Sequence, residues 1–178
     1  MQAPVLLTKR LRLRPVVETD ADALFAICAE PNLGPNAGWK PHETAEETKQ
    51  LIREVFSSPN VWAIERLDTQ ILIGTVGLME DEKRENPRIM TIGYSLSETA
   101  WGNGFMTEAV RGVLRYAFEE LKLRAVSATC YPFNERSRRV LLKCGFEAEG
   151  VLQEAEVLYN GEVYDHECYL LKIEEYLG

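Results

Sequence analysis

The stretch WGNGFMTEA, Trp101–Ala109, places two glycines one residue apart directly before a run of helix-forming residues. Glycine loses more conformational freedom on folding than any other residue, so the pair needs a reason. One reason is a tight turn that serves the fold alone. The other is an anion that approaches the backbone at a helix start, where N–H groups have no partner inside the helix.

The helix after this glycine turn is the clearest element of the chain. Its apolar residues recur at i, i+3 and i+4 spacing, which is typical of a helix that buries one face. These residues are Ala109, Val110, Val113, Leu114, Ala117, Phe118 and Leu121. Strands are expected on both sides of it, at 88–96 and 124–130. Because strand, helix and strand then form a βαβ unit, these two strands are expected to run parallel.

The remaining strands are expected mainly in hairpins. The alternation in RLRLR, residues 10–14, predicts a strand with Leu11 and Leu13 facing the core. Further helices are expected at 20–30, at 44–56 after a Thr44–Glu47 capping box, and at 134–144. Further strands are expected at 61–66, at 71–79 and from 146 onward, with a hairpin turn at Asn160-Gly161 and an irregular loop at 31–42. The predicted class is α/β with a mixed sheet: antiparallel N-terminal strands, a central βαβ unit with parallel strands, and flanking helices.

Length and composition favour a single domain. The chain has 178 residues, 46% of them hydrophobic, which suffices for one core, so one domain spanning 1–178 is expected. No apolar run approaches the roughly 20 residues that cross a membrane. At the N-terminus the positive charges follow the apolar residues, the reverse of a signal peptide. We therefore expect a soluble cytoplasmic protein without membrane partners.

Charge and cysteine usage exclude further classes. The net charge of −8 argues against a nucleic-acid partner, which needs clustered positive charge, and suits a cationic amine substrate. The cysteines Cys28, Cys130, Cys144 and Cys168 form no CxxC pair, and His42 and His166 stand alone. We expect neither a metal site nor a disulfide framework, and interpret the cysteines as small buried apolar side chains.

The glycine turn matches neither common nucleotide motif. A P-loop requires a lysine that the chain lacks after Gly104, and a dinucleotide-binding turn requires a third small residue where Thr107 stands. The strand, turn and amphipathic helix still predict an anion site. Backbone N–H groups of residues 103–107 would point out of the helix start, where the helix macrodipole adds roughly half a positive charge.

A second segment, NERSRRVLLKCGF at residues 134–146, decides between these interpretations. With it, the chain resembles the GNAT superfamily of acetyl-coenzyme A-dependent N-acetyltransferases. The family's Q/R-x-x-G-x-G/A turn corresponds to Trp101–Met106, and its N-x-x-S helix ending in GF follows on the next strand–helix unit. With TKRLRLRPVVETDADALFAI, IGYSLSETAWGNGF and EGVLQEAEVLYNGEVYDHECYLL, the resemblance covers nearly the whole chain and the GNAT fold is expected.

These four segments together resemble the branch of ribosomal-protein N-terminal acetyltransferases (Rim type). There are departures from the superfamily pattern. Trp101 replaces the usual Gln or Arg, Met106 replaces Gly or Ala, and Thr91 stands where relatives often carry Glu. The backbone amides at the helix start do not depend on the first two side chains.

The resemblance implies acetyl-coenzyme A as co-substrate. Its diphosphate would lie at the glycine turn and its pantetheine arm along the strand of Tyr94 and Leu96, where a backbone N–H polarises the thioester carbonyl. Asn134 would cap its helix and also contact the pantetheine amides. The basic run of Arg136, Arg138, Arg139 and Lys143 could be a solvated helix face, but beside a coenzyme A site Lys143 or Arg139 would reach the 3′-phosphate. The implied cofactor-binding residues are Tyr94, Leu96, Trp101, Gly102, Asn103, Gly104, Phe105, Met106, Thr107, Asn134, Ser137 and Lys143.

The same resemblance implies two catalytic residues. Glu156 matches the acidic residue that acts as general base in the Rim-type branch, and Ser137 matches the proton donor to the coenzyme A thiolate. Glu80 is a second candidate for the base, without such a match. Glu156 could instead be a solvated strand carboxylate, and Ser137 a local helix cap. Trp39 and Tyr159 are the candidates for the acceptor pocket, although Trp39 could equally fill the core beneath its loop.

The leading functional prediction is acetyl transfer to a primary amine, with a protein or peptide N-terminal α-amine as acceptor. An α-amino group has a pKa of about 7.7–8.0 against about 10.4 for lysine, so its neutral form is cheaper to expose at pH 7. Two alternatives stay open: acetylation of a small amine such as a polyamine, an amino acid or an antibiotic, and a coenzyme A-binding module without catalysis. A homodimer is compatible with the resemblance.

Overall fold

The computed structural model describes residues 2–56 and 58–177, so Met1 and Gly178, the ends of the predicted domain, lie outside the described residues. Strands of the described residues form a mixed sheet in the order β1-β2-β3-β4-β5-β6-β8-β7. The strands are β1 (Leu6–Leu7), β2 (Leu11–Pro15), β3 (Val61–Arg66), β4 (Leu72–Glu80), β5 (Ile89–Leu96), β6 (Ala125–Cys130), β7 (Glu147–Val157) and β8 (Val163–Lys172). The helices are α1 (Ala21–Cys28), α2 (Leu33–Ala37), α3 (Ala45–Leu51), α4 (Phe105–Glu119), α5 (Glu135–Lys143) and α6 (Ile173–Tyr176). The predicted α/β class with flanking helices is confirmed.

The chain divides into two compact units. Of the described residues, those within 1–77 and 94–112 form the first unit, and those within 78–93 and 113–178 form the second. Strands β4 and β5 and helix α4 each contribute residues to both units.

In the first unit, antiparallel strands form the core as predicted. Strand β2 pairs with β3, with Leu13 opposite Ile64, and β3 pairs with β4. Leu11 and Leu13 are fully buried, which confirms the orientation read from the alternating RLRLR segment. Trp62 on β3 is also fully buried, and its indole N–H donates to the Pro4 carbonyl at 2.6 Å.

Helix α3 begins at the predicted capping box, where Thr44 Oγ1 accepts from the Glu47 N–H at 3.3 Å. The chain stays helical through Phe56 as predicted, but the last part, Ile52–Phe56, is a π-helix. The expectation of an irregular loop at 31–42 is wrong in part, since it contains the short helix α2. The turn-forming residue Gly38 ends that helix at φ 92° rather than breaking it, and buried Leu33 anchors it.

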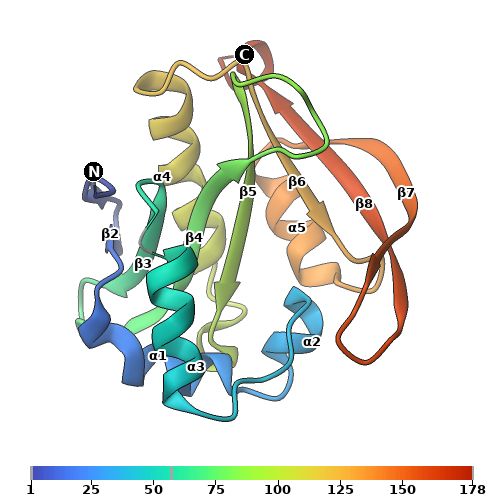
Figure 1. The fold of residues 1–178 in the computed structure, drawn as a ribbon. Coiled ribbons are helices and arrows are strands. Elements are labelled where there is room, and N and C mark those ends of the chain that lie inside the picture. Colours follow the sequence, from blue (N-terminus) through green and yellow to red (C-terminus); the bar gives the residue numbers. More distant parts are fainter. Residues whose placement is uncertain (1, 57, 178) are drawn as a thin grey trace. The chain divides into compact units, whose positions relative to one another are not determined.

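In the second unit, β5 and β6 run parallel, with Ile89 opposite Ala125, as the βαβ prediction required. Strand β6 pairs antiparallel with β8. Strands β7 and β8 pair antiparallel with each other and form a long hairpin (Figure 1). Helix α4 contributes to both units, and its predicted apolar face is buried from Ala109 to Phe118, whereas Leu121 lies beyond the end of the helix. Among the described residues, no helix is long and apolar enough to cross a membrane.

Candidate functional site

The glycine turn before α4 has the conformation that explains both glycines. Gly102 and Gly104 each adopt a φ of 76°, in the left-handed region that other residues rarely enter. The turn requirement alone therefore accounts for them. The space in front of the turn is nevertheless open, because a Cβ at Gly104 would meet only Arg10 Nη2, at 3.6 Å, within 4 Å.

Two side chains within the turn fix its shape. The Asn103 amide donates to the carbonyl oxygens of Ala100 and Trp101, at 3.2 and 2.9 Å. The Trp101 indole N–H donates to the Leu96 carbonyl at 2.8 Å and so ties the turn to the end of β5. Trp101, one of the departures from the family pattern, thus stabilises the turn through a hydrogen bond within the chain.

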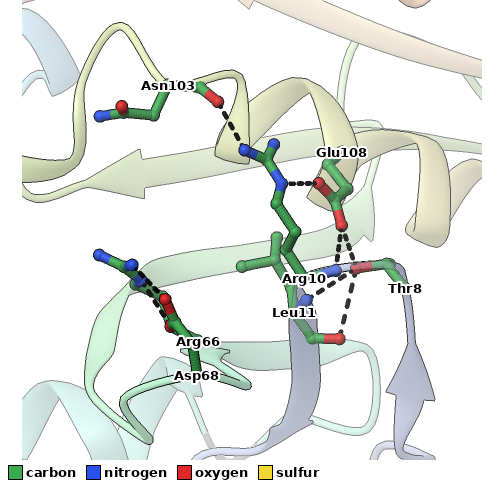
Figure 2. A network of polar contacts seen from close by, with 7 residues as sticks. All are labelled: Thr8, Arg10, Leu11, Arg66, Asp68, Asn103 and Glu108. Atoms are coloured by element: carbon green, nitrogen blue, oxygen red, sulfur yellow. Dashed lines mark hydrogen bonds and ion pairs between the residues drawn. The ribbon is translucent and has the colours of Figure 1, made fainter.

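A network of hydrogen bonds, which the sequence did not predict, connects the glycine turn to the segment between β1 and β2 (Figure 2). One carboxylate oxygen of Glu108 accepts from Thr8 Oγ1 and from the Arg10 backbone N–H, both at 2.7 Å, and the other from Arg10 Nε at 2.6 Å. Arg10 Nη1 then donates to the Asn103 carbonyl at 3.0 Å, so this arginine, directly before β2, contacts both the glycine turn and the first turn of α4. The RLRLR pattern indicates a strand but carries no signal for a partner so far along the chain.

The start of α4 presents backbone donors beside positive charge. The Glu108 N–H bonds to the Gly104 carbonyl at 3.1 Å, whereas the N–H groups of Gly104, Phe105 and Met106 have no partner among the described residues. The Arg10 guanidinium lies 4.4 Å from the centre of the Phe105 ring. A cavity of about 300 Å³ here is lined by Lys9, Arg10, Arg66, Leu67, Asp68 and Phe105. Unpaired amides suit a phosphate group, and Lys9 adds positive charge beside two arginines that are paired, Arg10 with Glu108 and Arg66 with Asp68.

Glu108→Gln is expected to lower the free energy of unfolding by about 1–2 kcal/mol at pH 7. Although burial opposes the shift, hydrogen bonds from Thr8 and Arg10 hold the pKa of Glu108 below its ordinary value. The carboxylate therefore stabilises the fold above its ordinary pKa, and this contribution is lost as the pH falls through the lowered pKa. Denaturant unfolding at pH 7 and at about pH 3 should show the difference between variant and wild type shrinking in acid. An equal difference at both pH values would contradict the assignment.

In the second unit, Glu156 lies in a polar cluster on the β7–β8 hairpin. The Tyr131 hydroxyl donates to Glu156 Oε2 at 2.8 Å, and His166 Nε2 lies 2.9 Å from the same oxygen. Burial, assisted by the hydrogen bond to Glu156, raises the pKa of Tyr131 well above its ordinary value, so this phenol keeps its proton and donates. The Tyr131 ring also packs against three neighbouring rings: the centroids of Phe133, Tyr164 and His166 lie 5.3, 5.3 and 5.6 Å from its own.

An irregularity in β7 brings Glu156 to this position. Leu152 pairs with His166 and Glu156 pairs with Tyr164, so four steps along β7 match two along β8. Glu154, within the bulge, has a φ of 49°, and its N–H donates to Asp165 Oδ1 at 2.8 Å. Bulges of this kind redirect side chains. Glu156 is thus held by two neighbours, in contrast with the exposed Glu147 on the same strand.

Helix α5 begins as predicted. The Asn134 side chain caps it by accepting from the Ser137 N–H at 3.1 Å, which places Ser137 in the first turn. Two arginines of the basic run have local partners, because Arg138 pairs with Glu167 at 2.7 Å and Arg139 with Glu135 at 3.0 Å. Lys143 lies in the last helical turn.

The acceptor candidates occupy different settings. Tyr159 lies in the turn between β7 and β8 and is 55% exposed. The Trp39 indole N–H, just after α2, is buried and has no hydrogen-bond partner among the described residues. Glu80, the second candidate base, lies at the exposed end of β4. Tyr94, on β5, is half-buried.

Comparison with known families identifies this arrangement. Residues 10–147 match the family model described as an acetyltransferase (GNAT) domain. The chain belongs to the GNAT family of N-acetyltransferases. The family match includes the glycine turn, α4 and α5, which are the segments that carried the resemblance.

Individual relatives agree with this GNAT assignment. The chain is 35% identical to the uncharacterized N-acetyltransferase YoaA of Bacillus subtilis, over 93% of this chain and 95% of that one. It is 33% identical to the [ribosomal protein uS5]-alanine N-acetyltransferase of Escherichia coli, over 42% of this chain and 38% of that one. The crystal structure of the microcin C7 self-immunity acetyltransferase MccE in complex with acetyl-CoA and AMP has the same fold, with a TM-score of 0.80. That structure is 23% identical and covers 93% of this chain and 94% of its own.

The cysteines and histidines of this GNAT enzyme form no metal centre in the part of the chain that the structure describes. Cys28 and Cys130 are buried, as interpreted, whereas Cys144 and Cys168 are partly exposed. Burial raises the pKa of Cys28 to about 11, so this thiol stays protonated and unreactive at neutral pH.

Proposed function

We propose that this N-acetyltransferase transfers the acetyl group of acetyl-coenzyme A to the N-terminal α-amine of a protein or peptide. The observation that carries the proposal is the open, left-handed glycine turn with unpaired amides at Gly104, Phe105 and Met106. The relative named for the alanine of ribosomal protein uS5 favours a protein α-amine over a small amine. We further propose that residues 1–178 act as one such domain; the cytoplasmic location and the homodimer stay predictions.

The diphosphate of acetyl-coenzyme A binds at the amides that begin α4, assisted by the macrodipole. Arg10 keeps the turn in its binding conformation through the Asn103 carbonyl. The pantetheine arm follows β5 near Tyr94. Because the Trp101 indole already bonds the Leu96 carbonyl, the arm pairs with backbone groups that precede that carbonyl. One β5 N–H polarises the thioester carbonyl.

The transfer needs two proton movements. Glu156 removes one proton from the ammonium group, and the neutral nitrogen then attacks the thioester carbonyl carbon. As the C–N bond forms and the C–S bond breaks, the Ser137 hydroxyl gives its proton to the departing thiolate. The nitrogen loses its second proton, which restores Ser137, and Glu156 releases the first proton to water. Atoms and charges therefore balance.

The acceptor class follows from the energy of the first step. At pH 7, exposing the neutral form of an α-amine costs about 1 kcal/mol, whereas a lysine side chain costs about 4–5 kcal/mol. Deprotonation by a single carboxylate base such as Glu156 therefore costs less free energy for the α-amine than for a lysine side chain. Trp39 and Tyr159 remain the proposed walls of the acceptor pocket, and Lys143 a proposed contact of the 3′-phosphate.

Ser137→Ala is expected to lower kcat about 10- to 100-fold while changing the Kd for acetyl-coenzyme A less than about 3-fold. The variant loses the hydroxyl that protonates the thiolate but keeps the backbone N–H that Asn134 caps. Steady-state kinetics and calorimetry measure the two effects. An unchanged kcat would remove Ser137 from the reaction and leave it a purely local role.

A thiol-release assay against a panel of acceptors tests the proposed function itself. The panel holds peptides with free or blocked N-termini, polyamines and aminoglycosides, and product mass locates the acetyl group. We expect turnover of the free peptides and none of the blocked ones. Turnover of polyamines or aminoglycosides alone would replace the proposal with a small-molecule acceptor. Binding of acetyl-coenzyme A without any turnover would support a non-catalytic module.

A further inference from the structure

We propose that His166 and Tyr131 are positioning residues that hold Glu156 by one oxygen, Oε2, so that the other oxygen, Oε1, receives the proton of the acceptor amine. In this arrangement His166 carries a proton on Nε2 and donates it to Glu156. The inference rests on the proposed role of Glu156 as base and goes beyond it, because it names the atom and the two residues that present it.

Both donors reach the same oxygen of Glu156. The Tyr131 hydroxyl lies 2.8 Å and His166 Nε2 lies 2.9 Å from Oε2. A carboxylate oxygen that accepts two hydrogen bonds can take a proton only by losing one of them. Glu156 Oε1 has no hydrogen-bond partner among the described residues, and the side chain is 38% exposed. The proton therefore arrives at Oε1.

The second nitrogen of His166 decides its tautomer. Nδ1 is buried and has no hydrogen-bond partner among the described residues. A proton on Nδ1 alone would be buried without an acceptor and would leave no donor at Nε2 for the carboxylate. The tautomer with its proton on Nε2 avoids both costs.

The bulge in β7 is what selects Glu156 for these two donors. From the pairing of Leu152 with His166, a regular antiparallel ladder would place Glu154 opposite Tyr164. The two additional residues place Glu156 there instead. Glu154 is turned aside, with its N–H bonded to Asp165. The backbone irregularity, Tyr131 and His166 thus act on the same carboxylate.

The protonation state is tested without any assay of activity. The chain contains only two histidines, so long-range ¹H–¹⁵N spectra of the full protein give two ring systems, which His42→Gln assigns. At pH 7 we expect His166 to show a protonated Nε2 and an unprotonated Nδ1. Averaged signals of two exchanging tautomers, or a proton on Nδ1, would overturn the inference.

A pair of variants tests the positioning role. In His166→Gln the side-chain amide can donate from about the place of Nε2, whereas His166→Leu removes the donor. We expect kcat within about 3-fold of wild type for the first and at least about 10-fold lower for the second. The Kd for acetyl-coenzyme A and the thermal midpoint are measured in both variants and should agree between them. Equal kcat values for the two variants would overturn the positioning role.

The way in which the loss of kcat depends on the pKa of the acceptor amine distinguishes a role in positioning Glu156 from a general structural role. With peptides that differ only in the pKa of the amine, His166→Leu and Tyr131→Phe should lose more kcat with the more basic amine. An equal loss for all amines would contradict the inference. If Glu156→Gln keeps wild-type kcat, the base assignment itself fails; if Glu156→Gln is impaired and His166→Leu is not, this inference alone fails.

Discussion

Gly104→Val is expected to weaken acetyl-coenzyme A binding about 100-fold, because the added methyl groups occupy the space before the amides that bind the diphosphate. The protein itself leaves room there, since the nearest atom to a Cβ added at this glycine is Arg10 Nη2, at an ordinary contact distance of 3.6 Å. The φ of 76° adds a cost of about 1–2 kcal/mol for a residue with a Cβ. Calorimetric titration with acetyl-coenzyme A measures the affinity.

Gly161→Val is the matched control for backbone strain. Gly161, in the hairpin turn after β7, has a φ of 84°, and a Cβ there would meet nothing within 4 Å. Both variants should lose similar thermal stability, whereas only Gly104→Val should lose affinity. Wild-type affinity in Gly104→Val would mean that the turn serves the fold alone.

Glu156→Gln is expected to lower kcat about 100-fold at pH 7 and to regain much of it near pH 9. The amide cannot take a proton, but at high pH an α-amine with a pKa of about 8 is already neutral. Steady-state kinetics from pH 6 to about pH 9.5 measure the recovery. Glutamine keeps the shape of the side chain and an oxygen that can accept from Tyr131, so the fold should be unaffected.

Glu147→Gln controls for the loss of a negative charge on β7. Glu147 is exposed on the same strand and faces Leu170 of β8, away from the pairing of Glu156 with Tyr164. Its kcat should match wild type at every pH. A ratio of wild-type to Glu156→Gln kcat that stays constant with pH would remove Glu156 from the role of base.

Much of the fold is predictable because its signals are local. The apolar spacing of α4, the alternation around Leu11 and Leu13, and the Thr44 capping box each specify one element from adjacent residues. The predictions of local structure are wrong where one residue type is compatible with two kinds of structure. Gly38, for example, is a turn former that here ends the helix α2.

The candidate site is less predictable because its contacts join distant segments. The bonds of Arg10 to Glu108 and of Tyr131 and His166 to Glu156 depend on strand register, which periodicity does not specify. The bulge that positions Glu156 is not predictable from the local sequence, because the residue with the positive φ is a glutamate, Glu154, and not a glycine. Resemblance to the family identifies Glu156 as a candidate, whereas its neighbours emerge only from the three-dimensional structure.

A crystal structure of the protein saturated with acetyl-coenzyme A tests most directly whether the glycine turn binds the diphosphate. We expect diphosphate oxygens about 2.7–3.2 Å from the backbone nitrogens of Gly104, Phe105 or Met106. Phosphates bound elsewhere, or an empty glycine turn in crystals that hold the ligand, would contradict it.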